Sequence, residues 1–72
     1  MVISDIQKNQ TEIIRIEITE FKGQRLLNIR TWYLDKNSGE YKPTPKGVAL
    51  KVELFAELKQ ALAKAEEALA GA

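Results

Sequence analysis

The chain has 72 residues and a formal net charge of +1 at pH 7, with 44% hydrophobic and 29% charged residues. A single domain of this size buries only about 60% of the surface that its unfolded chain exposes, so we expect self-association to add stability. Because the sequence lacks cysteine and histidine, it excludes disulfides, thiolate and histidine metal sites and the usual nucleophile–base pairs. We therefore predict no enzyme and no bound metal or cofactor.

Residues 1–10 show no clean hydrophobic period, and we predict a flexible N-terminal tail ahead of a domain over residues 11–70. The start of the chain lacks the basic and apolar regions of a signal peptide. No apolar run approaches the about 20 residues that a membrane helix needs. We expect an intracellular protein with no membrane partner, in the cytoplasm or nucleoid of a bacterium or the nucleus of a eukaryote.

Four strands are expected between residues 11 and 52. Ile14, Ile16 and Ile18 alternate with polar residues up to Glu20, which is the period of a strand with one buried face. Gly23 marks a hairpin turn into a second strand over residues 24–34. Turn residues then lead to a short third strand over residues 40–42, which Pro43 ends, and a fourth strand over residues 47–52.

A helix is expected from Glu53 onwards, because apolar residues recur there at steps of three and four among strong helix formers. Such a stripe can cover the sheet alone or also contact a partner helix, and we favour a helix that does both. The residues predicted for a dimer interface are Leu54, Phe55, Leu58, Ala61, Leu62, Ala65 and Leu69.

The charges are unevenly distributed along the chain. Residues 21–51 contain seven lysines and arginines and only two acidic residues, so that this segment has a net charge of +5 in a nearly neutral molecule. Aromatic residues lie among these cations, at Phe21, Trp32 and Tyr33. Cations that follow the phosphate backbone and rings on which bases stack are typical of single-stranded nucleic-acid binding. An ordinary strand pair with core aromatics and a solvated face is the alternative.

Three segments resemble a known family. The run FKGQRLLNIRTWYLD, then GEYKP, then PKGVAL before a helix, is similar to the single-stranded-DNA-binding domain of the transcriptional coactivator family called positive cofactor four, including its short bacterial members. The resemblance covers residues 12–69. It implies an α+β fold, in which a curved four-stranded antiparallel sheet precedes one C-terminal helix and the helix mediates homodimerisation.

The resemblance also implies a function and a set of binding residues. The expected function is non-enzymatic binding of single-stranded DNA with little sequence preference, in transcription as a coactivator or regulator, or in replication and DNA repair. Gln24 stands where the family often has lysine, and the order of Trp32 and Tyr33 is reversed, which leaves open which ring stacks. The predicted nucleic-acid-binding residues are Phe21, Lys22, Gln24, Arg30, Trp32, Tyr33, Lys42 and Lys46.

Two alternatives use the same sheet. One is an RNA-binding protein, since no residue pattern here distinguishes a 2′-hydroxyl. The other is a module that recruits a protein partner.

Overall fold

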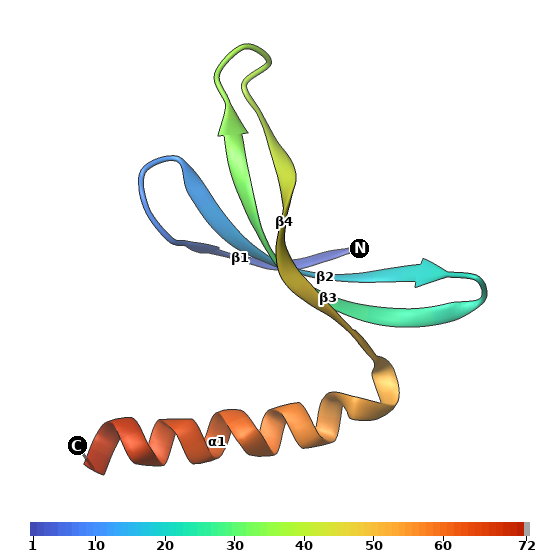
Figure 1. The fold of residues 1–72 in the computed structure, drawn as a ribbon, viewed down its shortest axis with the longest axis vertical. Coiled ribbons are helices and arrows are strands. Elements are labelled where there is room, and N and C mark those ends of the chain that lie inside the picture. The colour runs from blue at the N-terminus through green and yellow to red at the C-terminus, as the bar shows by residue number, and fades with distance from the viewer. Residues whose placement is uncertain (72) are drawn as a thin grey trace.

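The computed structural model describes residues 1–71, which form one antiparallel sheet of four strands followed by one helix (Figure 1). The strands are β1 (Val2–Gln7), β2 (Glu12–Phe21), β3 (Gln24–Asp35) and β4 (Glu40–Lys51), and they neighbour one another in chain order. A 3-10 turn η1 (Val52–Leu54) leads into helix α1 (Phe55–Gly71). The predicted α+β fold, a four-stranded antiparallel sheet followed by one C-terminal helix, is confirmed. Within residues 1–71, no helix has the length and apolarity that crossing a membrane requires.

β2 and β3 form the hairpin that the alternating pattern predicts, paired without interruption from Glu12 opposite Tyr33 to Phe21 opposite Gln24. Its turn places Lys22 at φ 52° and Gly23 at φ 76°. Positive φ at both central residues is the geometry of a tight turn whose twist matches that of the strands. Glycine adopts it freely, whereas lysine does so rarely.

The two short strands predicted over residues 40–42 and 47–52 are instead one continuous strand, β4. Pro43 does not end it, because β4 lies at the sheet edge, where a missing N–H leaves no ladder bond unmade. The register shifts between Arg30–Gly47 and Trp32–Pro43, so that β4 has extra residues opposite Thr31. The prolines are thus accommodated by a bulge in an edge strand.

The flexible tail predicted over residues 1–10 is corrected for residues 2–7, which form β1 and pair antiparallel with β2. A register shift between Val2 and Ser4 breaks the period of two in this strand. Because a bulge moves the following side chains to the other face, the pattern in the sequence is lost. The β1–β2 connection folds back through hydrogen bonds from the backbone N–H groups of Lys8 and Asn9 to the carbonyl of Glu12.

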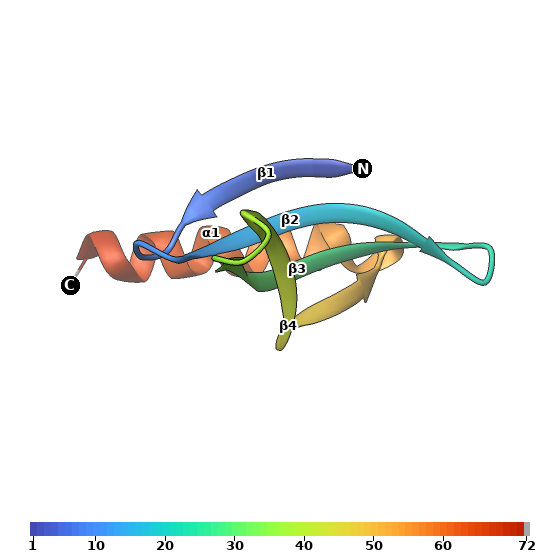
Figure 2. The same ribbon diagram turned by 90° about the horizontal axis from the view of Figure 1, so that it is seen from above.

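The register divides the side chains between two faces of the sheet. Ile14, Ile16 and Ile18 of β2 lie opposite Thr31, Ile29 and Leu27 of β3, and Val48 and Leu50 of β4 extend this set. We call this the isoleucine face. The other face contains Ile13, Arg15, Arg30 and Trp32, and we call it the arginine face. These two faces lie on opposite sides of a curved sheet, and Figure 2 shows its curvature.

Helix α1 does not cover the sheet in the single chain. It extends away from the end of β4, and none of its residues is buried (Figures 1 and 2). Leu62 and Leu69 on its apolar stripe are 60% and 78% exposed. Among hydrophobic residues 1–71, only Ile13 of the arginine face is buried. The reading in which the helix covers the sheet of its own chain is therefore wrong, and the stripe is left for another surface.

Candidate nucleic-acid interface

Phe21, Lys22 and Gln24 lie together at the tip of the β2–β3 hairpin. Phe21 is 62% exposed, and Lys22 Nζ lies 5.4 Å from the centroid of its ring, within cation–π range. Lys22 has no ion-pair partner among the described residues. The tip therefore presents an open aromatic surface with an unneutralised cation beside it.

Tyr33 and Trp32 lie on opposite faces of the sheet, because successive residues of a strand alternate. Tyr33 is on the isoleucine face and 42% exposed, between Glu12 of β2 and Lys42 of β4. Trp32 is on the arginine face, less exposed, with the guanidinium carbon of Arg15 at 4.5 Å from its ring centroid. One side of the indole is thus covered by a cation from its own chain, whereas the ring of Tyr33 is open.

Arg15 is fixed above Trp32 by an ion pair. Its Nε donates to Asp5 Oδ1 at 2.9 Å and its Nη2 to Asp5 Oδ2 at 3.2 Å. This hydrogen bonding raises the pKa of Arg15 and lowers that of Asp5. Since Asp5 belongs to β1, the first strand helps to hold the ring of Trp32 on the arginine face.

Lys42 is tied to Asp35 across the β3–β4 turn. Its Nζ lies 2.9 Å from Asp35 Oδ2, and this contact raises the pKa of Lys42 and, together with the backbone N–H of Asn37, lowers the pKa of Asp35. Part of the charge of Lys42 is thus neutralised within the chain.

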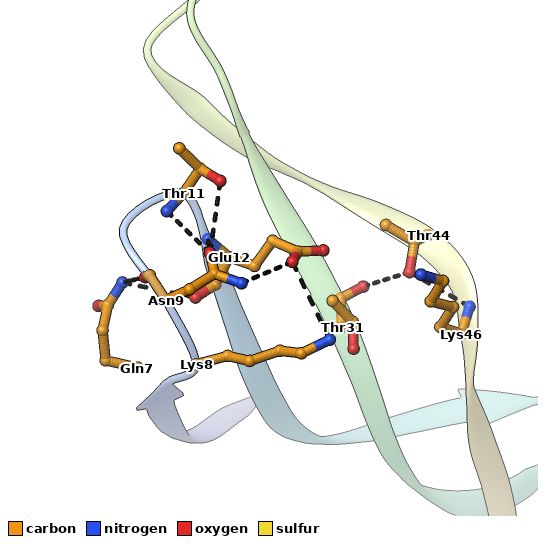
Figure 3. Close-up of polar contacts among 8 residues, drawn as sticks. All are labelled: Gln7, Lys8, Asn9, Thr11, Glu12, Thr31, Thr44 and Lys46. Carbon is orange, nitrogen blue, oxygen red and sulfur yellow. Dashed lines mark hydrogen bonds and ion pairs between the residues drawn. The ribbon is translucent and has the colours of Figure 1, made fainter.

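Lys46 lies on the bulge of β4, which hydrogen bonds hold in place. Thr44 Oγ1 donates to the carbonyl of Thr31 at 2.7 Å and accepts from the N–H of Lys46 at 3.2 Å (Figure 3). Arg30 Nη1 donates to the carbonyl of Thr44 at 2.9 Å. Arg30 keeps further N–H donors free of this bond, since a guanidinium has five. Lys46 has no ion-pair partner within residues 1–71.

Gly47 lets β4 approach β3 closely beside Lys46. A Cβ added at Gly47 would lie 2.7 Å from the carbonyl oxygen of Ile29 and 2.8 Å from Arg30 Cα. Only glycine fits this contact without a shift of the backbone, so the path of the bulge depends on it.

A shallow, open pocket lies at one end of the isoleucine face, between the bulge and the β1–β2 connection. Its surface is mainly apolar, with a floor of Ile14, Ile29 and Val48, and Lys8, Thr31 and Lys46 also line it. Arg30 contributes to the lining as well, although its side chain belongs to the arginine face. Lys8 was missed by sequence reasoning because it lies in the segment predicted as a tail. Figure 3 shows its side chain extending from the connection towards Thr31, so that cations from β1–β2 and from β4 line one pocket.

The predicted binding residues thus fall into three groups. Tyr33, Lys42 and Lys46 lie on the isoleucine face, at the pocket end of the sheet. Arg30 and Trp32 lie on the arginine face. Phe21, Lys22 and Gln24 lie at the hairpin tip, about 30 Å from Tyr33 along β3 at about 3.4 Å per residue. Within residues 1–71, no three acidic, cysteine or histidine side chains gather in a way that would hold a metal ion.

A second pocket on the isoleucine face is entirely apolar in its lining. It lies between β1, β2, β3 and the start of the helix, where Phe55 is 51% exposed. Its lining residues are Ile3, Ile16, Ile18, Leu27, Val52 and Phe55. Leu54, Ala61, Leu62, Ala65 and Leu69 of the predicted dimer interface are exposed as well, and Leu58 is half-buried. The chain therefore exposes an apolar surface that runs from the sheet onto the helix.

Comparison with known proteins gives the same fold. The crystal structure of a PC4 homolog from Burkholderia pseudomallei superposes with a TM-score of 0.85 at 33% sequence identity, covering 92% of this chain and 88% of that one. A bacteriophage T5 homolog of the eukaryotic coactivator PC4, implicated in recombination-dependent DNA replication, gives a TM-score of 0.64 at 29% identity, covering 92% and 80%.

The sequence itself is similar to eukaryotic coactivators. It is 37% identical over 67 residues to the RNA polymerase II transcriptional coactivator SUB1 of Saccharomyces cerevisiae, covering 93% of this chain and 22% of that protein. The chain thus spans about a fifth of the length of that relative. The family model of transcriptional coactivator p15 (PC4) matches residues 8–61. Family model, sequence relatives and fold agree, and the chain belongs to the PC4 family of transcriptional coactivators.

Proposed function

We propose that the chain binds single-stranded DNA through the pocket end of the isoleucine face and the β2–β3 hairpin tip. The observation that carries this proposal is the exposed ring of Tyr33 on the same face as the unneutralised Lys46. Binding of this kind needs an aromatic ring on which a base can stack and a cation that contacts the adjacent phosphate. Family membership supports it.

The hairpin tip supplies a second contact of the same kind, with Phe21 as the ring and Lys22 as the cation. A flexible single strand can follow both contacts over the curved sheet, whereas a stiff duplex keeps its bases stacked inside. The proposal therefore includes a preference for single strands over duplex. No catalytic step is part of it, and the binding would serve transcription, replication or repair inside the cell.

We further propose that the chain acts as a homodimer. Its apolar stripe on α1 and the apolar pocket on the isoleucine face are exposed in the single chain. Burying each such large side chain contributes about 1.5–3 kcal/mol, and the partner helix supplies a surface of matching chemistry. The two basic ends of the sheets would then form one binding surface.

A competition titration tests the proposed function. Labelled oligo-dT is bound to the protein and displaced by unlabelled single-stranded DNA, duplex DNA or RNA at two salt concentrations. Displacement by single-stranded DNA at lower concentration than by duplex is expected, with a slope of about −0.7 in log K against log salt for each phosphate neutralised. Stronger displacement by RNA would instead assign the surface to RNA.

The matched variants are Lys46→Ala and Lys59→Ala. Both remove one lysine, but Lys46 lines the pocket, while Lys59 lies on the exposed helix. The first should weaken binding severalfold and make the salt slope shallower, and the second should change neither. Equal affinity for duplex and single strand, or binding that salt does not affect, would refute the proposal and favour a protein-recruiting module.

A further inference from the structure

The pocket that Lys8 and Lys46 line has an acidic side chain beside it. Glu12 begins β2 and lies opposite Tyr33, on the isoleucine face. Its Oε1 lies 4.0 Å from Nζ of Lys8, one of the two lysines that line the pocket. Figure 3 shows the carboxylate and the Lys8 ammonium meeting near Thr31.

Asn9 fixes the position of this carboxylate. Its Nδ2 donates to Glu12 Oε1 at 2.8 Å, while its Oδ1 accepts from the backbone N–H groups of Thr11 at 3.0 Å and Glu12 at 2.9 Å. The amide is thus engaged at both ends, which keeps Glu12 from turning away into solvent. The hydrogen bond from Asn9, and then the charges of Lys8 and Lys46, lower the pKa of Glu12, so the side chain is ionised at neutral pH.

We infer that Glu12 is an internal anion that restrains nucleic-acid affinity, because its carboxylate engages Lys8 in the free protein and a backbone phosphate must take its place. The inference rests on the proposed function and adds Lys8 and Glu12 to it. Binding then exchanges one ion pair for another at Lys8 and places the phosphate near a fixed negative charge. Both effects lower the affinity that the two lysines alone would give.

Glu12→Gln tests this directly, since glutamine keeps the size and a hydrogen-bond acceptor for Asn9 but removes the charge. An exposed ion pair of this kind changes an equilibrium constant by up to about fivefold. We expect oligo-dT to bind about two- to fivefold more tightly to this variant. The salt dependence should steepen by about 0.7 per protomer if a further phosphate is neutralised.

Glu67→Gln is the matched control, because it removes the same charge from an exposed helix position that does not line the pocket. Equal tightening in both variants would show an effect of net charge alone and would overturn the inference. Unchanged or weaker binding by Glu12→Gln would overturn it as well. Circular dichroism and thermal unfolding of each variant check that the fold is kept.

A double-mutant cycle with Lys8→Gln separates the inference from a general loss of charge. Loss of Lys8 should weaken binding more in the Glu12→Gln background than in the wild-type chain. In that background Lys8 has no ion pair with residue 12 to give up before it meets the phosphate. An equal loss in both backgrounds would overturn the inference. If the wild-type chain binds oligo-dT but the cycle shows no coupling between Lys8 and Glu12, only this inference is refuted. If neither the wild-type chain nor any variant binds oligo-dT, the proposed function is refuted too.

Discussion

Tyr33 and Trp32 are neighbours in the chain, yet the structure gives them different surroundings. The alternation of β3 puts Tyr33 beside Lys42 on the isoleucine face, and puts Trp32 beneath the guanidinium of Arg15. A ring that already faces a cation of its own chain offers only its other side to a base. Tyr33 is therefore the ring that we expect to stack, and Trp32 is the ring that Arg15 covers.

We predict that Tyr33→Ala weakens oligo-dT binding by about 1–3 kcal/mol, the value of one base stacked on an aromatic ring. Tyr33→Phe, which keeps the ring, should bind almost as the wild-type chain does. Fluorescence anisotropy of labelled DNA measures both. Full affinity in Tyr33→Ala, or strong quenching of Trp32 emission on binding, would move the stacking role to Trp32.

Acid should destabilise the fold through two aspartates. The pKa of Asp5 is lowered by Arg15, and that of Asp35 by Lys42, so both bind protons less readily when folded than when unfolded. The stability they contribute is present above about pH 4 and falls as the pH drops through their folded pKa values. Urea unfolding at pH 7 and pH 3 should show a smaller acid loss for Asp35→Asn than for wild type. Equal losses would contradict the prediction.

At the scale of elements, the bulge in β4 positions Lys46, and Gly47 makes the bulge fit against β3. We predict that Gly47→Ala lowers the free energy of unfolding by about 1–3 kcal/mol, because the added Cβ meets backbone atoms that cannot move independently. Gly71→Ala is the control, since its Cβ would meet nothing within 4 Å. Chemical denaturation measures both, and an unchanged midpoint for Gly47→Ala would contradict the close approach.

The sequence predicted some of these elements better than others. The isoleucine alternation and the Lys22-Gly23 turn indicated the β2–β3 hairpin, and the three-four spacing indicated the helix. The sequence does not predict β1, because the bulge in this strand interrupts the alternation of apolar and polar residues. It predicts two strands in place of β4, because a proline such as Pro43 usually ends a strand unless that strand lies at the edge of a sheet. The sequence does not predict Lys8 as a site residue either, because only the pairing of β1 with β2 brings Lys8 to the pocket.

At the scale of the whole molecule, the chain is a plate with extents of 42 × 38 × 18 Å that has too little interior to bury its apolar side chains. Only a second layer against the isoleucine face and the helix would remove them from water. We therefore expect the stability of the folded state to depend on protein concentration, as it does for obligate dimers.

Leu62→Glu tests this dependence. The change places a charge in the middle of the exposed apolar stripe, and sedimentation equilibrium should show a shift from dimer to monomer with a lower thermal midpoint. Gln60→Glu adds the same charge to the opposite side of the helix and should leave the dimer intact. A wild-type chain that sediments as a monomer at high micromolar concentration would refute the dimer.

The positive φ of Lys22 means that fold stability and DNA binding favour different residues at this position of the hairpin turn. Asparagine adopts this backbone conformation more readily than lysine, so Lys22→Asn should raise the thermal midpoint of the free protein while it weakens DNA binding. Lys22 thus lowers the stability of the free turn while it supplies a cation at the hairpin tip. Thermal melts and DNA titrations of Lys22→Asn measure the two effects together.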